Sequence, residues 1–221
     1  MRLNKISYSI LICSILLLSS SSAFGAGLYG QVLRKAPTET KKKIQRYKSR
    51  KAETEQVAGN CECNPGLFSV IYLTGENLPD IRPELKNQKM AQKDKTFEPS
   101  VMAVSLGSTV EFPNLDPFFH NVFSYSSTKK FDLGRYPEGK SKEVTFDKPG
   151  IVSIFCEIHY TMRAYVHVLE TPYYTVSDKD GNFALQNIQP GNYTLHLWQE
   201  NLPEITEEID IVNDSTYMEL R

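Results

Sequence analysis

Short apolar runs separated by turn residues follow one another along the chain after residue 25, and they limit the fold more than any other feature. Helical periodicity is scarce in this part, whereas Gly, Pro, Asn and Asp recur between the runs. In residues 193–198 (YTLHLW) apolar and polar side chains mostly alternate, as in a strand with one buried face. The sequence therefore predicts an all-β protein built from sandwiches of short antiparallel strands.

The predicted strands form two groups that meet at residues 170–172. The first group comprises residues 68–73, 101–104, 109–112, 143–146, 151–156 and 164–169. The second group comprises residues 173–176, 182–185, 193–198 and 205–212. We expect four segments: a leader (1–25), N-terminal strands with a basic linker (26–87), a first β body (88–170) and a second, smaller β-sandwich (171–221).

The first 25 residues have the parts of a secretory signal peptide. Arg2 and Lys5 precede an apolar run at residues 10–18, and small residues follow up to an A-x-G sequence at 23–25. The apolar run is much shorter than the roughly 20 residues that a membrane-spanning helix needs. We expect the signal peptide to be removed and the protein to be secreted or periplasmic, with no membrane span.

Basic residues are concentrated in one segment of a nearly neutral chain. The chain has 25 basic and 26 acidic residues, a balance that does not favour a nucleic-acid partner. Residues 34–51 contain nine Lys or Arg and one Glu. A solvated linker is the favoured interpretation of this basic arm, and a docking site for an anionic partner is the alternative.

Three cysteines follow residue 25, so at least one of them lies outside an internal disulfide. Cys61 and Cys63 are compatible with a small strained ring, with bonds between chains or with metal binding, and the sequence leaves these alternatives open. Cys156 differs because it lies in FCEIHYTM, residues 155–162, close to His159 and Met162.

Cys156, His159 and Met162 offer a thiolate, an imidazole and a thioether within seven positions. A copper ion that alternates between Cu(I) and Cu(II) is held by such ligands together with a second imidazole. We expect the second imidazole from His120, which follows an apolar stretch and is expected at the end of a strand. Zinc also accepts Cys and His but gains little from the thioether of Met162, so the set favours copper.

Each of these residues alone would more often be a packing residue than a ligand. Their order and spacing together favour one metal site. The two remaining histidines, His167 and His196, have no neighbouring ligand types in the sequence and are expected to be surface or packing residues.

A distant His followed by Cys-x-x-His-x-x-Met resembles the type 1 copper site of the cupredoxins, the family of plastocyanin, azurin and amicyanin. The resemblance extends over about residues 89–170, through TFEPSVMAVSLGSTVEFPNLDPFFHNVF and KPGIVSIFCEIHYTM. This part of the sequence is also similar to periplasmic proteins of the methylamine-utilisation type. It implies a Greek-key cupredoxin β-sandwich with one type 1 copper ion. The ligands that it implies are His120, Cys156, His159 and Met162.

The resemblance also implies roles for residues beside the ligands. Asn121 resembles the family asparagine whose hydrogen bonds steady the ligand loop, although Asn is also common in turns. His159 would be the ligand nearest the surface, within a water-poor electron-transfer patch. That patch would contain Pro117, Phe118, Phe119 and Tyr160.

Two departures from the family concern the redox potential and the partner surface. Tyr160 and Thr161 stand where related loops often have a proline, and residues 124–141 form an insertion.

The C-terminal stretch DKDGNFALQNIQPGNYTLHLW resembles a carboxypeptidase-regulatory or transthyretin-like β-sandwich. Residues 171–221 are few for such a domain, and residues 28–32 and 69–73 resemble its missing early strands. We therefore hypothesise that the cupredoxin is inserted into this sandwich. Trp198, Tyr173 and Tyr174 are candidates for a sugar platform, but aromatic residues in strands mostly pack in cores.

These features favour an electron carrier that exchanges electrons with donor and acceptor redox proteins. We do not expect an enzyme, because four protein ligands leave no metal position for a substrate. Two alternatives stay open: a copper-binding or copper-delivery protein that uses Cys61 and Cys63, and a non-redox β-sandwich binding module.

Overall fold

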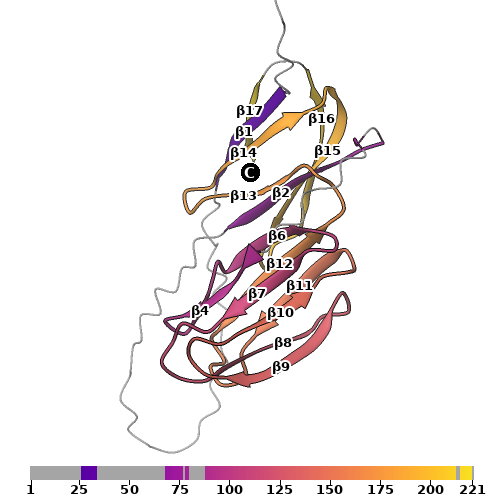
Figure 1. The fold of residues 1–221 in the computed structure, drawn as a ribbon. Helices are drawn as coiled ribbons and strands as arrows, with labels where there is room; N and C mark the ends of the chain where they lie inside the picture. The colour runs from indigo at the N-terminus through magenta and orange to yellow at the C-terminus, as the bar shows by residue number, and fades with distance from the viewer. Residues whose placement is uncertain (1–25, 34–67, 77, 80–87, 213–214, 221) are drawn as a thin grey trace, which may run out of the picture.

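The computed structural model of the protein describes residues 26–33, 68–76, 78–79, 88–212 and 215–220 (Figure 1). These residues form strands β1 to β17 and contain no helix, which confirms the all-β prediction. Within the described ranges there is accordingly no helix that is long and apolar enough to cross a membrane. The expected signal peptide, the basic arm, Cys61 and Cys63 lie outside the described residues.

The cupredoxin-like body is formed by two sheets and a small hairpin. The five-stranded sheet has the order β6 (Val101–Ser105), β12 (Arg163–Leu169), β11 (Gly150–Phe155), β8 (His120–Tyr125) and β9 (Lys130–Tyr136). The three-stranded sheet has the order β10 (Ser141–Thr145), β7 (Thr109–Pro113) and β3 (Gln88–Lys89). The hairpin consists of β4 (Ala91–Lys93) and β5 (Thr96–Glu98).

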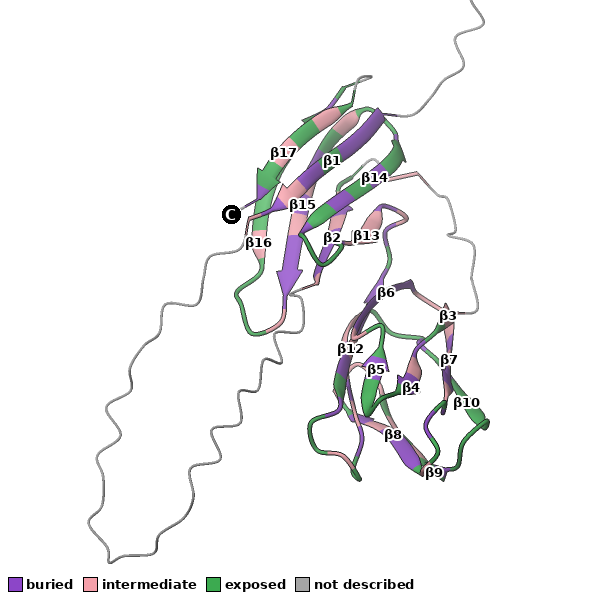
Figure 2. Cartoon of the chain, turned by 90° about the vertical axis from the view of Figure 1, so that its left-hand side faces the viewer, coloured by how far each residue is buried: buried purple, intermediate pink, exposed green. Residues whose placement is uncertain are grey.

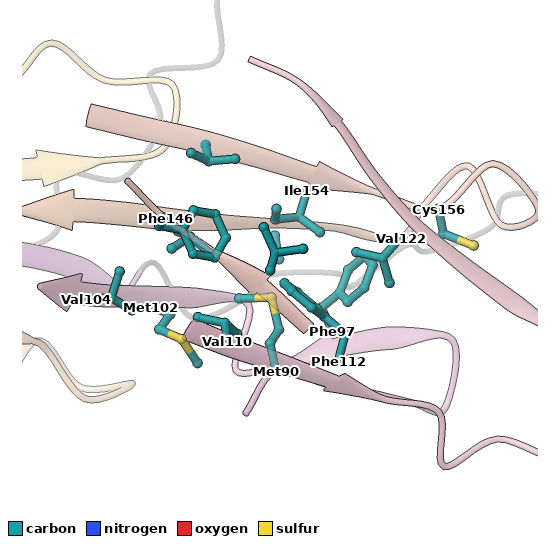
Figure 3. Packing of buried hydrophobic residues seen from close by; sticks show 14 of the residues in the cluster. Met90, Phe97, Met102, Val104, Val110, Phe112, Val122, Phe146, Ile154 and Cys156 are labelled. Carbon is teal, nitrogen blue, oxygen red and sulfur yellow. The ribbon is translucent and has the colours of Figure 1, made fainter. Parts of the chain in front are cut away.

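An apolar core fills the space between these two sheets (Figure 3). Val110 and Phe112 of β7 are fully buried, whereas the residues between and beside them are partly exposed, as the period of a half-buried strand requires. Burying one such large apolar side chain stabilises the fold by about 1.5–3 kcal/mol. Cys156 lies at one end of the core, so the core ends at the predicted ligand loop.

The second body is also a two-sheet sandwich. One sheet has the order β14 (Asn182–Ile188), β1 (Ala26–Val32) and β17 (Thr216–Leu220). The other has the order β13 (Tyr174–Val176), β2 (Ser69–Thr74), β15 (Gly191–Gln199) and β16 (Ile205–Ile211). Figure 2 shows how buried and exposed residues alternate along β14, the pattern of a strand with one face on a core.

The pairing of β1 and β2 bears on the insertion hypothesis. β1 pairs with β14 and β17, and β2 pairs with β13 and β15, so both join strands that follow the cupredoxin-like body in the sequence. Pairing of β1 with cupredoxin strands alone would have contradicted the hypothesis, and it does not occur. The cupredoxin-like body therefore enters the chain between β2 and β13 of the second sandwich.

The structure differs from the sequence expectations around His120. This residue does not end an apolar strand, as expected, but begins β8, because β7 ends at Pro113 and a loop separates the two strands. The expected insertion at residues 124–141 contains the end of β8 and all of β9, which pair as an antiparallel hairpin. Phe131 and Leu133 of β9 alternate with polar residues and pack against the core. The many charged residues of β9 make this alternation hard to recognise in the sequence.

A third apolar cluster joins the two bodies, where β2 and β13 of the sandwich lie beside β6 of the cupredoxin-like body (Figure 1). Its buried members are Val70, Val101, Ala103, Leu169 and Trp198. Trp198 is buried in this cluster, Tyr173 is buried in the core of the second sandwich, and the hydroxyl of half-buried Tyr174 bonds to Ser105 at 2.8 Å. These aromatic residues pack inside the protein, as expected for aromatic residues in strands, and do not form an exposed sugar platform.

His167 of β12 is buried in this junction between the rings of Tyr72 and Trp198, at centroid distances of 5.3 and 5.7 Å. Its Nδ1 has no hydrogen-bond partner among the described residues. Burial lowers the pKa of His167 to about 4, with Glu204 opposing and His196 adding to the decrease. Protonation of this ring is therefore unfavourable in the folded protein.

We predict that His167 makes the free energy of unfolding depend on pH. The unfolded chain takes up the proton near pH 6.5 and the folded chain near pH 4, so stability falls by up to about 3 kcal/mol as the pH drops through this window. Urea unfolding at pH 7 and pH 4.5 should show a smaller loss for His167→Gln than for the native protein. Equal losses in the two proteins would contradict the prediction, because other titrations are common to both.

Candidate metal centre

Three of the four predicted ligands meet at one end of the cupredoxin-like core. Sγ of Cys156 lies 3.7 Å from Nδ1 of His120 and 3.9 Å from Nδ1 of His159. The two Nδ1 atoms lie 3.1 Å apart. Metal–nitrogen and metal–sulfur bonds of about 2.0–2.3 Å place ligand atoms roughly 3–4 Å from one another. These side chains are therefore spaced to hold one metal ion.

Met162 is the last residue of the ligand loop and is buried in the same cluster as Cys156. Its amide donates to the carbonyl of His159 at 2.9 Å, and its carbonyl accepts from the amide of Cys156 at 3.4 Å. These bonds close the loop and bring the backbones of Cys156 and Met162 together. A thioether is a ligand that favours copper over zinc, so the donor set fits copper.

Sheet pairing explains why residues 36 positions apart meet. Cys156 follows the last residue of β11, and Met162 precedes the first residue of β12. Phe155 pairs with Arg163 of β12 on one side and with Phe123 of β8 on the other. Because β8, β11 and β12 are neighbours in one sheet, the predicted ligands at their ends lie at the same end of the sheet.

Asp116 orients the His120 ring. Its Oδ2 lies 2.8 Å from Nε2 of His120, and both groups are buried. Burial opposes ionisation of Asp116, but the amides of Lys95 and Asp94 and the ring of His120 outweigh it and lower the pKa of this carboxyl. An ionised carboxylate only accepts hydrogen bonds, so Nε2 carries the proton and Nδ1 keeps the lone pair that faces Cys156.

Asn114 holds the loop that contains Asp116. Its side-chain amide donates to the carbonyls of Phe118 and Tyr136 at 2.8 and 3.0 Å, and its Oδ1 accepts from the amide of Asp116 at 3.0 Å. Asn114 is fully buried, so these bonds satisfy backbone groups that water does not reach.

Asn121 connects β8 to the ligand loop. Its Oδ1 accepts a 2.7 Å hydrogen bond from the amide of Glu157, the residue after Cys156. The side chain of Glu157 pairs with Arg135 of β9 at 2.7 Å. The hydrogen bond between Asn121 and the Glu157 amide is of the kind that the cupredoxin resemblance implied for Asn121.

The predicted electron-transfer patch surrounds the more exposed of the two imidazoles. Phe119 and Tyr160 are 55% and 93% exposed, and Pro117 is also exposed. The half-buried ring of Phe118 lies 5.2 Å from that of His120 and 5.4 Å from that of His159. Apolar side chains therefore line the approach to the ligands.

His159 is itself half-buried, whereas His120 is fully buried. Burial, His120 and Lys95 lower the pKa of His159, while Asp116 acts in the opposite direction. The imidazole of His159 is thus predominantly neutral near pH 7, the form that binds metals.

Sequence reasoning missed four residues of this site. Asp116 and Asn114 escaped notice because their partners are set by the loop, although an Asn and an Asp inside an apolar stretch before His120 were a signal. Leu115 and Ile158, 52% and 38% exposed, extend the apolar patch. Their exposure follows from loop geometry that a sequence pattern does not show.

Comparison with protein families supports this architecture. Residues 84–169 match the family of copper binding proteins of the plastocyanin/azurin type, so this part of the chain is cupredoxin-like, as the resemblance implied. Residues 168–217 match domain II of polysaccharide lyase family 4. No curated protein matches the chain.

Several solved structures are similar to the cupredoxin-like part. A Cu-containing nitrite reductase from Thermus scotoductus SA-01 is 26% identical over 38% of this chain and 23% of its own, with a TM-score of 0.37. A purple cupredoxin from Nitrosopumilus maritimus is 20% identical over 38% of this chain and 100% of its own, with a TM-score of 0.34. A reduced Cu(I) form of an amicyanin mutant is 18% identical over 45% of this chain and 98% of its own, with a TM-score of 0.36. The chain thus spans about a quarter of the nitrite reductase.

We predict that Asn114→Ala lowers the free energy of unfolding by about 3 kcal/mol, because it leaves buried backbone groups of Phe118, Tyr136 and Asp116 without partners. Urea unfolding checks this value. Asn192→Ala, at an exposed position of β15, is the matched control and should change the free energy by no more than about 0.5 kcal/mol. Similar values for both variants would show that the Asn114 bonds contribute little.

Proposed function

We propose that the protein is a periplasmic type 1 copper protein that carries single electrons between redox partner proteins. The observation that carries the proposal is the convergence of the Cys156 thiol with the Nδ1 atoms of His120 and His159, beside buried Met162. A copper ion held there would supply a one-electron Cu(I)/Cu(II) couple.

The chain's own residues support electron transfer in place of substrate turnover. A thiolate, two imidazoles and a thioether would occupy the metal's coordination positions and leave none for a substrate. Asp116 keeps the donor nitrogen of His120 in place, so little rearrangement accompanies a change of charge. We therefore propose a carrier and no enzymatic activity.

The exposed apolar rim is suited to brief contact with other proteins. Phe119, Tyr160 and Leu115 are exposed, and the ring of Phe118 lies 5.4 Å from that of partly exposed His159. Weak redox encounters use small contact areas of this kind. The partners would be a redox donor and a redox acceptor protein.

We predict that residues 26–221 bind one Cu(II) ion and show an intense thiolate-to-copper charge-transfer band in the visible spectrum. Cys156→Ser should lose the band, because the band requires this sulfur. A Cys61→Ser/Cys63→Ser double variant, which keeps Cys156, is the control and should keep the band. Absence of both colour and bound copper in the native protein would refute the proposed function.

The same double variant tests copper delivery, the competing function. A delivery protein passes its metal to an acceptor, and Cys61 and Cys63 would then be part of the relay. Loss of copper loading in the double variant would favour delivery. Retained copper with reversible oxidation and reduction would favour the carrier.

We also predict that Asp116→Asn weakens copper binding about 10–100-fold, because an amide no longer holds the His120 tautomer as a carboxylate does. Competition with a chelator of known affinity measures the change. Asp147→Asn is the control, since Asp147 is an exposed carboxylate whose Oδ1 pairs with Lys129 at 2.8 Å. An affinity equal to that of the native protein would mean that the carboxylate does not orient the ligand.

A further inference from the structure

The ligand loop has few hydrogen bonds of its own and depends on anchors outside it. Within the loop, the backbone bonds are those from Met162 to His159 and from Cys156 to Met162, and the second is long at 3.4 Å. The N-terminal side is held from the cupredoxin-like body, by the bond between Asn121 and the Glu157 amide. The C-terminal side continues directly into Arg163, the first residue of β12.

Arg163 is bound by a residue of the other body. Nη2 of Arg163 lies 2.8 Å from Oε1 of Glu200, which follows the last residue of β15 in the second sandwich. The same oxygen accepts a 3.0 Å hydrogen bond from the hydroxyl of Tyr165, two residues farther along β12. One carboxylate oxygen of the sandwich thus binds two side chains of the strand that leaves the ligand loop.

Glu200 is the less exposed partner of this ion pair. Its side chain is 14% exposed and that of Arg163 is 51% exposed, so solvent reaches the pair from the arginine side. The preceding strand is fixed by Trp198, whose ring packs edge-on against that of Tyr165 at 5.4 Å. Asn201 donates a further bond to Glu200 at 3.1 Å. The carboxylate of Glu200 is thus bound by Asn201 and Tyr165 as well as by Arg163.

We infer that Glu200 is a positioning residue through which the second sandwich holds the C-terminal end of the ligand loop, and with it Met162. The part of this inference that concerns copper rests on the proposed function. Since Arg163 follows Met162 directly, the position of the thioether depends on where β12 begins. The thioether is the weak ligand by which such sites tune their redox potential. The accessory sandwich is thus a structural part of the metal centre, and no residue of it needs to contact the ligands.

Hydrogen exchange of the metal-free protein tests the anchor independently of copper. Glu200→Gln keeps the size of the side chain and removes its charge. We expect amides of residues 156–163 to exchange about tenfold faster in this variant, because a hydrogen-bonded charge is replaced by a neutral amide. Amides of β7, in the other sheet of the cupredoxin-like body, should keep their native rates. Glu208→Gln is the matched control, since this carboxylate accepts from Thr194 within the sandwich.

Two results would overturn the inference. One is native exchange of the ligand loop in Glu200→Gln. The other is equal acceleration in the loop and in β7, which would mean that the variant only lowers global stability. A double-mutant cycle with Arg163→Gln adds a second criterion: the two effects should not be additive if the residues act through each other. Additive effects would contradict the pairing.

Spectra of the copper-loaded protein then separate this inference from the proposed function. If copper binds, Glu200→Gln should shift the charge-transfer band or the reduction potential, and Glu208→Gln should leave both unchanged. A spectrum and a potential that equal the native ones would contradict control of Met162 by Glu200. If the native protein binds no copper, the proposed function fails, and the exchange data still decide whether Glu200 anchors the loop.

Discussion

The pairing of Phe155 with both neighbouring strands sets the geometry of the candidate site. Phe155 pairs with Phe123 on one side and with Arg163 on the other, so the predicted ligands at the ends of three strands are placed relative to a single residue. A shift of one residue in this register would turn Cys156 out of the core, because side chains alternate between the two faces. Val122 and Ile154, which precede Phe123 and Phe155, are fully buried. A shift would expose them and is therefore unfavourable. The hydrophobic core thus determines the arrangement of the candidate metal site.

The order of the strands explains how two small sandwiches share one chain. Since β1 and β2 pair with strands that come after the cupredoxin-like body, the second sandwich closes only when the chain has completed both bodies. The apolar cluster around Trp198 then fixes the bodies against each other. His167 is buried in this contact and stays neutral near pH 7. Protonation of His167 would therefore destabilise the junction.

Much of this arrangement follows from the sequence. The alternation in residues 193–198 and the turns between the apolar runs predicted the all-β fold, and the spacing of Cys156, His159 and Met162 predicted a loop that bears ligands. The strands β3, β4, β5, β9 and β17 were missed because their charged or short apolar patterns give weak signals. His120 was placed at the wrong end of a strand, because residues 114–119 are apolar enough to read as strand while Asn114 and Asp116 hold them in a loop.

Partners that lie far apart in the sequence were beyond prediction for a physical reason. Glu200 and Arg163 meet only because two separately formed sheets pack together, and neither residue stands in a pattern of its own. The same holds for the different surroundings of the two imidazoles. His120 is buried and fixed by a carboxylate, whereas His159 is partly exposed among apolar side chains. In the proposed carrier, the fixed inner imidazole would keep the geometry constant while the outer imidazole would face the partner. This difference follows from depth in the fold, which the sequence does not encode locally.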